Sequence, residues 1–296
     1  MKKILLPTDF SNNAWNAICY ALEFFKNEKC EFHILHTYTP IFYRIDYIIG
    51  GPTFSAVTDK GVDIAQAGLD KTLVDIKLKY KNAKHIFKIR SAFNTLTNEV
   101  KELTETNKFD FIVMGTQGAT GAKEIFLGTN TVHIIRKSTI PVLTVPSGYE
   151  FKEIKSIVFP TDYRQSYQKK NLHILYTLAK TLKAQLTILH IKEEYDLNDE
   201  QKMNIKVLAN YFKKLEPSFV EERGKLMPQA IHEYIEENKP DLLVMMNRKH
   251  SFLERLREKS NVDSIGCHIA IPFMTIPESQ QVPVKKIDKE RNSVTV

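Results

Sequence analysis

Short apolar runs alternate with amphipathic segments along the whole chain. The first apolar run covers residues 3–7, and the segment after it repeats apolar residues at helical spacing: Ala14, Ile18, Ala21, Leu22 and Phe25. The same pattern predicts strands at 31–37, 84–90, 110–114 and 141–145, and helices over 57–81, 95–106 and up to 137. Strands that alternate with helices predict a parallel sheet with right-handed crossovers and helices on both faces.

This order of elements occurs twice. Residues 3–10 (KILLPTDF) are echoed by 156–163 (SIVFPTDY), and residues 140–146 (IPVLTVP) by 271–277 (IPFMTIP). The second half has predicted strands at 154–160, 185–191, 217–222, 241–245 and 273–276. A tandem duplication predicts one domain for each copy. We expect domains at 1–148 and 149–278, followed by a basic tail at 279–296.

Spaced glycines follow the predicted strand at 110–114. The sequence from Gly115 reads Gly-x2-Gly-x9-Gly-Thr, with the third glycine at Gly128, and a helical segment begins at Thr129. Glycines let a backbone approach a ligand closely, and a helix N-terminus offers free N–H groups to phosphate. The spacing therefore predicts a phosphate-binding loop.

The second copy has lost these glycines. At the equivalent positions it carries Met246, Lys249 and Lys259, followed by Ser260 and Asn261. Side chains then occupy the positions where the backbone would meet phosphate. We expect the second domain to be degenerate as a nucleotide site, with a residual anion site from Lys249, Lys259 and Ser260 as the alternative.

Three motifs together resemble the universal stress protein family. They are Pro-Thr-Asp after the first strand, Leu-His at the end of the second strand, and the glycine motif after the fourth. The resemblance covers essentially the whole chain. It implies an α/β fold of two tandem Rossmann-like domains, each with a five-stranded parallel sheet. It also implies bound ATP where the motif is complete, and pairing of the two domains through their last strands, 142–144 and 273–275.

The family pattern also implies which residues bind the nucleotide. They are Pro7, Thr8, Asp9, Thr37, Gly115, Gly118, Lys123, Gly128, Thr129 and Asn130. In this assignment Asp9 lies near the adenosine part of ATP, and Thr37 contacts adenine through its backbone. The residues alone leave two alternatives open: Lys123 either reaches a phosphate or is a solvated lysine, and either Asp9 or Ser11 caps the following helix.

Two other features invite a functional interpretation. His33 and His36 lie three apart on a strand, so they face opposite sides of the sheet and cannot bind one metal ion together. His190 repeats His36 in the degenerate copy, which favours packing or a structural hydrogen bond as the role of these histidines. Residues 38–58 have no counterpart in the second half, and we leave open whether they form a lid, a docking surface or ordinary packing.

Three classes of function compete: a nucleotide-binding regulator, an ATP-hydrolysing enzyme and a nucleotide-free scaffold. Turnover requires a positioned water, a base and a metal site. The chain has no Walker sequence, and Glu124 is the acid nearest the loop, although Asp9 could hold Mg²⁺ through water. We assign no catalytic or metal-ligating residue. We expect an ATP-binding regulator of protein contacts in the stress response, whose hydrolysis, if any, is slow.

Composition adds limits on partners and compartment. The net charge of +7 invites a nucleic-acid interpretation, but lysines alternate with glutamates along predicted helices, which is typical of a solvated face. The three cysteines suggest neither a disulfide framework nor a zinc site, and no apolar run is long enough to span a bilayer. We therefore expect a cytoplasmic protein without nucleic-acid or membrane partners. A homodimer and an unidentified protein partner remain open.

Overall fold

The computed structural model describes residues 1–39, 60–116, 128–164, 167–192, 196–225, 227–247 and 270–277. Several predicted features lie outside these ranges. They are Gly118, Lys123, Glu124, Lys249, Lys259, Ser260, Asn261, most of segment 38–58 and the tail 279–296.

The described part of the first half follows the predicted order of strands and helices. Its elements are β1 (Lys2–Pro7), α1 (Asn12–Phe24), β2 (Cys30–Tyr38), α3 (Lys60–Lys79), β3 (His85–Phe93), α4 (Leu96–Thr106), β4 (Phe111–Gly115), α5 (Thr129–Lys137) and β5 (Val142–Val145). The second half repeats this order. Its elements are β6 (Ser156–Thr161), α6 (Lys169–Leu182), β7 (Gln185–Lys192), α7 (Asp199–Phe212), a 3₁₀ turn (Lys213–Leu215), β8 (Ser218–Arg223), α8 (Met227–Asn238), β9 (Leu242–Asn247) and β10 (Phe273–Pro277).

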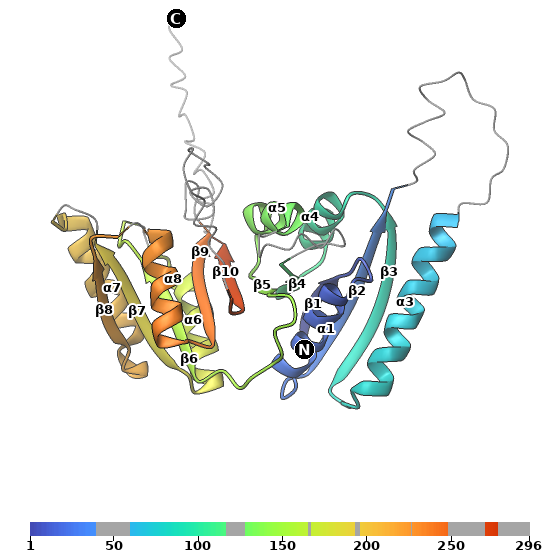
Figure 1. The fold of residues 1–296 in the computed structure, drawn as a ribbon, viewed down its shortest axis with the longest axis horizontal. Helices are drawn as coiled ribbons and strands as arrows, with labels where there is room; N and C mark the ends of the chain where they lie inside the picture. The colour runs from blue at the N-terminus through green and yellow to red at the C-terminus, as the bar shows by residue number, and fades with distance from the viewer. Residues whose placement is uncertain are drawn as a thin grey trace, which may run out of the picture.

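All these strands join in one ten-stranded sheet, in the order β3-β2-β1-β4-β5-β10-β9-β6-β7-β8 (Figure 1). Within each half the strands pair in parallel, which confirms the predicted α/β fold with a five-stranded sheet in each copy. Across the sheet, the strands of the second half follow the same order as their equivalents in the first half, but in the opposite direction. The two orders meet at the centre, where β5 and β10 pair antiparallel. The two halves are therefore related as the two copies of a two-fold pair.

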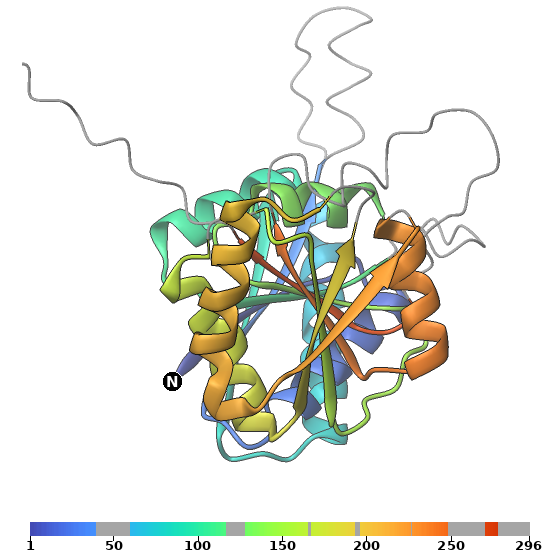
Figure 2. The same cartoon turned by 90° about the vertical axis from the view of Figure 1, so that its left-hand side faces the viewer.

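Helices cover both faces of the sheet (Figure 2). One layer contains α1, α3, α6 and α7, and the other contains α4, α5 and α8, as the two clusters of buried residues show. The inner strands β1, β4, β5, β6 and β9 are apolar on both sides. In β1, Ile4 and Leu6 belong to the first cluster and Leu5 to the second. This explains why the strands read as continuous apolar runs instead of an alternating pattern. None of the described helices is long and apolar enough to cross a membrane.

The predicted pairing of the last strands is confirmed. Thr144 lies opposite Phe273, Leu143 opposite Met274, and Val142 opposite Thr275. Two buried threonines add side-chain bonds across the junction: the Thr144 hydroxyl donates to the Phe273 carbonyl (3.0 Å), and the Thr275 hydroxyl to the Val142 carbonyl (3.4 Å). Each half thus contributes one such bond at equivalent positions.

The linker between the halves lies against α1. The Asn16 side-chain amide donates to the carbonyl oxygens of Pro146 and Tyr149, both at 3.2 Å. The buried Tyr20 ring packs against Tyr149 and Phe151. These contacts fix the path of the chain from β5 to β6.

An aspartate that occurs in both copies joins two strands at their amino ends, opposite the carboxyl ends where the glycine motif begins. The Asp110 carboxylate accepts from the Lys3 backbone N–H (2.7 Å). Its equivalent, Asp241, accepts from the backbone N–H groups of Lys155 and Ser156, each at 2.9 Å, and from the Ser156 hydroxyl at 2.8 Å. Each half therefore uses an aspartate before its fourth strand to hold the start of its first.

We expect Asp241→Ala to lower the free energy of unfolding by about 1–3 kcal/mol, because it leaves three donors without this acceptor. Urea unfolding measures the change. The matched control is Asp196→Ala, whose carboxylate is fully exposed beside Lys192, so its removal should leave the free energy of unfolding almost unchanged. Equal effects of the two substitutions would contradict the structural role of Asp241.

Candidate functional site

The carboxyl ends of β1, β2 and β4 lie at one edge of the first half, because β1 pairs with β2 on one side and β4 on the other. The chain adds β2 and β3 on one side of β1, then β4 and β5 on the other. Strand order therefore reverses between β1 and β4. In open α/β sheets ligands bind at such a switch point, outside the carboxyl ends of the strands.

Among the predicted site residues in the described ranges, those after β1 and β4 come to this switch point. Pro7 ends β1 and Thr8 and Asp9 follow it, while Gly115 ends β4. Thr37 lies nearby in the last part of β2, two residues beyond Leu35, which pairs with Pro7. The start of α5, with Gly128, Thr129 and Asn130, is bonded to the end of β4.

A tight turn connects β1 to α1. The Thr8 hydroxyl accepts from the Phe10 N–H and the Asp9 carboxylate from the Ser11 N–H, both at 3.0 Å. Phe10 has a φ of 63°, in the left-handed region that is costly for a residue with a side chain. The Ser11 hydroxyl accepts from the Ala14 N–H (3.2 Å) and caps α1. Ser11 is therefore the N-cap that the sequence had left undecided, and the exposed Asp9 carboxylate holds the turn.

An aromatic stack holds this turn in place. The Phe10 ring lies on the His36 imidazole, with centroids 4.2 Å apart. His36 Nδ1 bonds to the Thr8 carbonyl at 2.8 Å. A carbonyl can only accept, so Nδ1 carries the proton. On the other side, α3 approaches so closely at Gly68 that a Cβ there would lie 2.5 Å from the Phe10 ring.

The second half builds the same turn. Tyr163 has a φ of 56°, its N–H donates to the Thr161 hydroxyl (2.9 Å), and its ring stacks on His190 at 4.4 Å. The packing role predicted for His36 and His190 is thus confirmed. His33 instead bonds Glu31 (2.6 Å), and no group of three metal-binding side chains occurs in the described part of the chain. The turn itself forms in a copy without the glycines, so it does not depend on them.

Gly115 has a packing reason to be glycine. A Cβ at this position would lie 2.4 Å from the side-chain nitrogen of Asn13 in α1. In the second half Met246 takes the equivalent position and is 9% exposed, within the apolar cluster on the α6 side. There α6 begins only at Lys169, well after the Tyr163 turn, whereas α1 begins at Asn12 directly after the Phe10 turn.

The N-terminus of α5 is tied to β4 but has no side-chain cap. The Gly128 N–H donates to the Thr116 carbonyl, and the Thr131 hydroxyl to the Gly115 carbonyl at 3.0 Å. Gly128 is the N-cap residue and has no side chain to cap the helix, and the first turn carries no acid. Thr129 and Asn130 are exposed. An uncapped, exposed helix start next to a strand end suits an anion.

Thr116 is a residue that the sequence did not single out. It is 2% exposed, and its hydroxyl has no hydrogen-bond partner within the described residues. It directly follows Gly115, where the glycine motif begins. The only sequence signal for Thr116 was its position inside the motif. The motif is defined by the spacing of its glycines, so it does not mark the threonine between them.

The equivalent edge of the second half is closed by its own side chains. The Gln201 amide donates to the Asp162 carbonyl and the Asn204 amide to the Tyr163 carbonyl, both at 2.8 Å. Both residues belong to α7, so this helix is bonded to the turn after β6. A cavity of about 20 Å³ lies at this edge, and Asp162, His190 and Gln201 are among the residues that line it.

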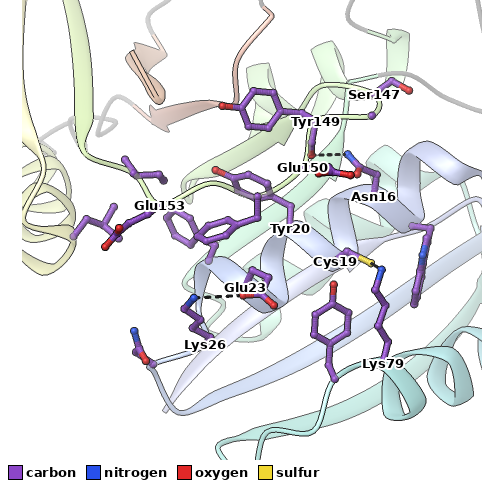
Figure 3. Close-up of a pocket in the computed structure, with 18 of the residues that line it drawn as sticks. Asn16, Cys19, Tyr20, Glu23, Lys26, Lys79, Ser147, Tyr149, Glu150 and Glu153 are labelled. Carbon is purple, nitrogen blue, oxygen red and sulfur yellow. Dashed lines mark hydrogen bonds and ion pairs between the residues drawn. The ribbon is translucent and has the colours of Figure 1, made fainter. Parts of the chain in front are cut away.

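A larger cavity, about 1180 Å³, lies between α1, the linker and the end of α6 (Figure 3). Its lining mixes aromatic and charged side chains, among them Trp15, Tyr20, Tyr80, Tyr149, Lys79 and Lys183. In Figure 3 the Lys79 ammonium lies beside the Cys19 sulfur, at 3.9 Å. None of the predicted site residues lines this cavity. The residues that line it are up to 171 positions apart in the sequence (Asn12 to Lys183), so local sequence patterns could not predict this cavity.

Comparisons with known proteins agree with this geometry. A model of the universal stress protein family matches residues 1–146 and again residues 153–277. Universal stress protein MJ0577 of Methanocaldococcus jannaschii is 32% identical over 152 residues, which are 49% of this chain and 94% of that protein. MJ0531 of the same organism is 27% identical over 149 residues, 49% of this chain and 81% of that protein. The chain therefore belongs to the universal stress protein family.

A solved structure shares the arrangement of both halves. The universal stress protein of Archaeoglobus fulgidus covers 93% of this chain and 98% of its own length, with a TM-score of 0.67 at 17% identity. At this identity the likeness shows the fold alone. The Rossmann-like tandem architecture is thus shared across essentially the full length.

We expect Gly115→Ala to lower the free energy of unfolding by about 1–3 kcal/mol, because the added Cβ overlaps Asn13. The double variant with Asn13→Ala removes the overlap, so it should lose less stability than the sum of the single variants. A double-mutant cycle by urea unfolding measures this difference. Strict additivity would show that Asn13 is not what excludes a side chain at 115.

We also expect His190 to make stability depend on pH. Burial lowers its folded-state pKa, against an opposing contribution from Glu221. The unfolded state then binds more protons near and below the usual histidine pKa, so stability falls as pH drops through about 6.5, by at most about 1.4 kcal/mol per pH unit. His190→Phe keeps a ring on Tyr163 but removes the titration. Unfolding from pH 7 to pH 5 should show a flatter curve for the variant; parallel curves would contradict the prediction.

Proposed function

We propose that the first half binds ATP at the carboxyl edge of β1, β2 and β4, and that occupancy regulates contacts with other proteins under stress. The observation that carries this proposal is the switch point itself. It brings the Pro-Thr-Asp turn, Gly115 and the uncapped start of α5 to one edge, in the half whose glycine motif is complete. Gly118 and Lys123 belong to the same motif and complete the assignment.

The described residues fit the phosphate end of a nucleotide. The Gly128 N–H is already bonded to the Thr116 carbonyl, so it does not donate to phosphate. In this proposal Gly128 lets the backbone approach the ligand closely. The donors available to phosphate are the backbone N–H groups of Thr129 and Asn130 and the Thr129 hydroxyl. The Thr116 hydroxyl, which has no partner within the described ranges, is a further candidate donor.

The other end of the nucleotide would lie toward β1 and β2. Thr37 would contact adenine through its backbone, and the exposed Asp9 carboxylate would lie near the adenosine part. When Mg²⁺ accompanies ATP, Asp9 could reach it through a bound water. The Phe10 and His36 stack would keep this turn rigid below the ligand.

We propose one nucleotide per chain, because the second half differs at the same positions. Met246 places a side chain at the position where Gly115 has none, and Gln201 and Asn204 bond α7 to the turn after β6. The second half would then supply the paired sheet and not a second ligand site.

The first experiment is a calorimetric titration of ATP, with and without Mg²⁺, into the full chain stripped of nucleotide. We expect about one ATP per chain, and phosphate release measured in parallel shows whether ATP is turned over. An absence of binding would overturn the proposal and leave an interaction scaffold as the function.

The site assignment is tested by Gly128→Lys, which imitates the second copy. It should abolish ATP binding while leaving thermal unfolding of the nucleotide-free protein nearly unchanged. The matched control is Thr139→Lys, which introduces the same side chain at an exposed position past the other end of α5. Unimpaired binding by Gly128→Lys, or an equal loss in the control, would contradict the role of the glycine motif.

A further inference from the structure

Asn247 connects the second half to the helix that carries the proposed phosphate site. It ends β9 and follows Met246, so it is the repeat equivalent of Thr116. The Asn247 side-chain amide donates to the backbone carbonyl of Ile135, which belongs to the other half of the chain. The position that directly follows the first glycine of the motif in one half therefore reaches across the junction in the other.

The accepting carbonyl lies in the last turn of α5. The last carbonyls of a helix have no donor within the helix and need one from elsewhere. Ser138, the C-cap residue, supplies its N–H to Ile134 at 2.8 Å. The next carbonyl, that of Ile135, receives the amide of Asn247. The second half thus completes the C-terminus of α5.

The opposite end of α5 is fixed to β4 by the Thr131 and Gly128 bonds described above. Between the ends, Ile134 and Ile135 are 2% and 1% exposed, in a cluster that includes Leu243 and Phe273 of the second half. The helix has nine residues and is about 13 Å long, too short to be stable without its surroundings. The C-terminal anchor therefore lies within about two and a half turns of the first turn of the helix.

We infer that Asn247 is a positioning residue for the nucleotide site: it anchors the C-terminus of α5 so that its N-terminus stays aimed at phosphate. This inference rests on the proposed ATP site in the first half. It assigns the second half a part in that site, although this half has lost the glycines. It also explains why asparagine suits this position, since it needs a side chain that donates across the junction to a carbonyl.

The test compares three variants of the full chain. Asn247→Leu keeps a similar volume but cannot donate, and Asn247→Gln keeps a donor. Thr144→Val is the matched control, because it removes another side-chain-to-carbonyl bond across the same junction, at 3.0 Å, which joins β5 to β10 and does not involve α5. Two measurements are made on each: calorimetric affinity for ATP, and hydrogen exchange of the α5 backbone amides from Val132 to Ser138 without nucleotide.

We expect Asn247→Leu to weaken ATP binding about tenfold, the effect of losing roughly one buried hydrogen bond. Exchange in the last turn of α5 should also become faster. Asn247→Gln should recover most of both effects, and Thr144→Val should leave both within about twofold of wild type. If glutamine restores affinity and exchange, and Thr144→Val changes neither, Asn247 acts by anchoring α5. A general loosening of the junction would affect the control variant as well.

Two outcomes overturn the inference alone: unchanged affinity in Asn247→Leu while wild type binds ATP, or an equal loss in Thr144→Val. Wild-type protein that binds no ATP would overturn the proposed function, and with it the positioning role. In that case the exchange measurement still decides whether Asn247 anchors α5. The failure of the inference and the failure of the proposed function are therefore distinguishable.

Discussion

The antiparallel pairing of β5 with β10 is the interaction on which the rest of the structure depends. It turns two five-stranded sheets into one, buries Leu143 and Met274 at the centre, and satisfies strand edges that would otherwise be open. The Thr144 and Thr275 hydroxyls bond to carbonyls on the opposite strand from equivalent positions. Because this junction fixes the two halves relative to each other, it also decides which side chains of one half can reach the helices of the other.

The two copies share the same arrangement of strands and helices but differ at the carboxyl ends of their strands. Both contain a left-handed aromatic residue stacked on a histidine after the first strand, and both use an aspartate before the fourth strand to hold the first. What differs is the carboxyl edge. The first half keeps glycine where α1 packs closely, and the second replaces it with Met246 and bonds α7 across the turn. The duplication has thus kept the same supporting architecture in both copies, while their carboxyl edges differ.

The linker makes a second joint between the halves. Asn16 holds two of its carbonyls, and Tyr20 packs against its aromatic residues, so the chain passes along α1 before entering β6. The large cavity beside it follows from this path, since its walls are α1, the linker and the end of α6. None of the predicted site residues in the described ranges lines this cavity.

By itself, the sequence determined the class of fold, the duplication and the place of the glycine motif, because these are written in local periodicity and in repeats that need no knowledge of contacts. The predicted strand at 31–37 is β2 (Cys30–Tyr38), and the helix expected over 57–81 contains α3 (Lys60–Lys79). The pairing of the last strands came from the family resemblance and is confirmed by their register. Ser11 as the N-cap, by contrast, was one of two alternatives until the hydrogen bonds chose between them.

Only the tertiary structure decided the contacts between residues far apart in the chain. Asn13 excludes a side chain at Gly115, and Asn247 donates to Ile135, across 102 and 112 positions respectively. Neither pair has a periodic signature, since each depends on where a helix is placed against a strand end. The same holds for the buried hydroxyl of Thr116 and the cavity along α1. Periodicity records which face of an element is apolar, whereas these features depend on which elements the folded sheet brings together.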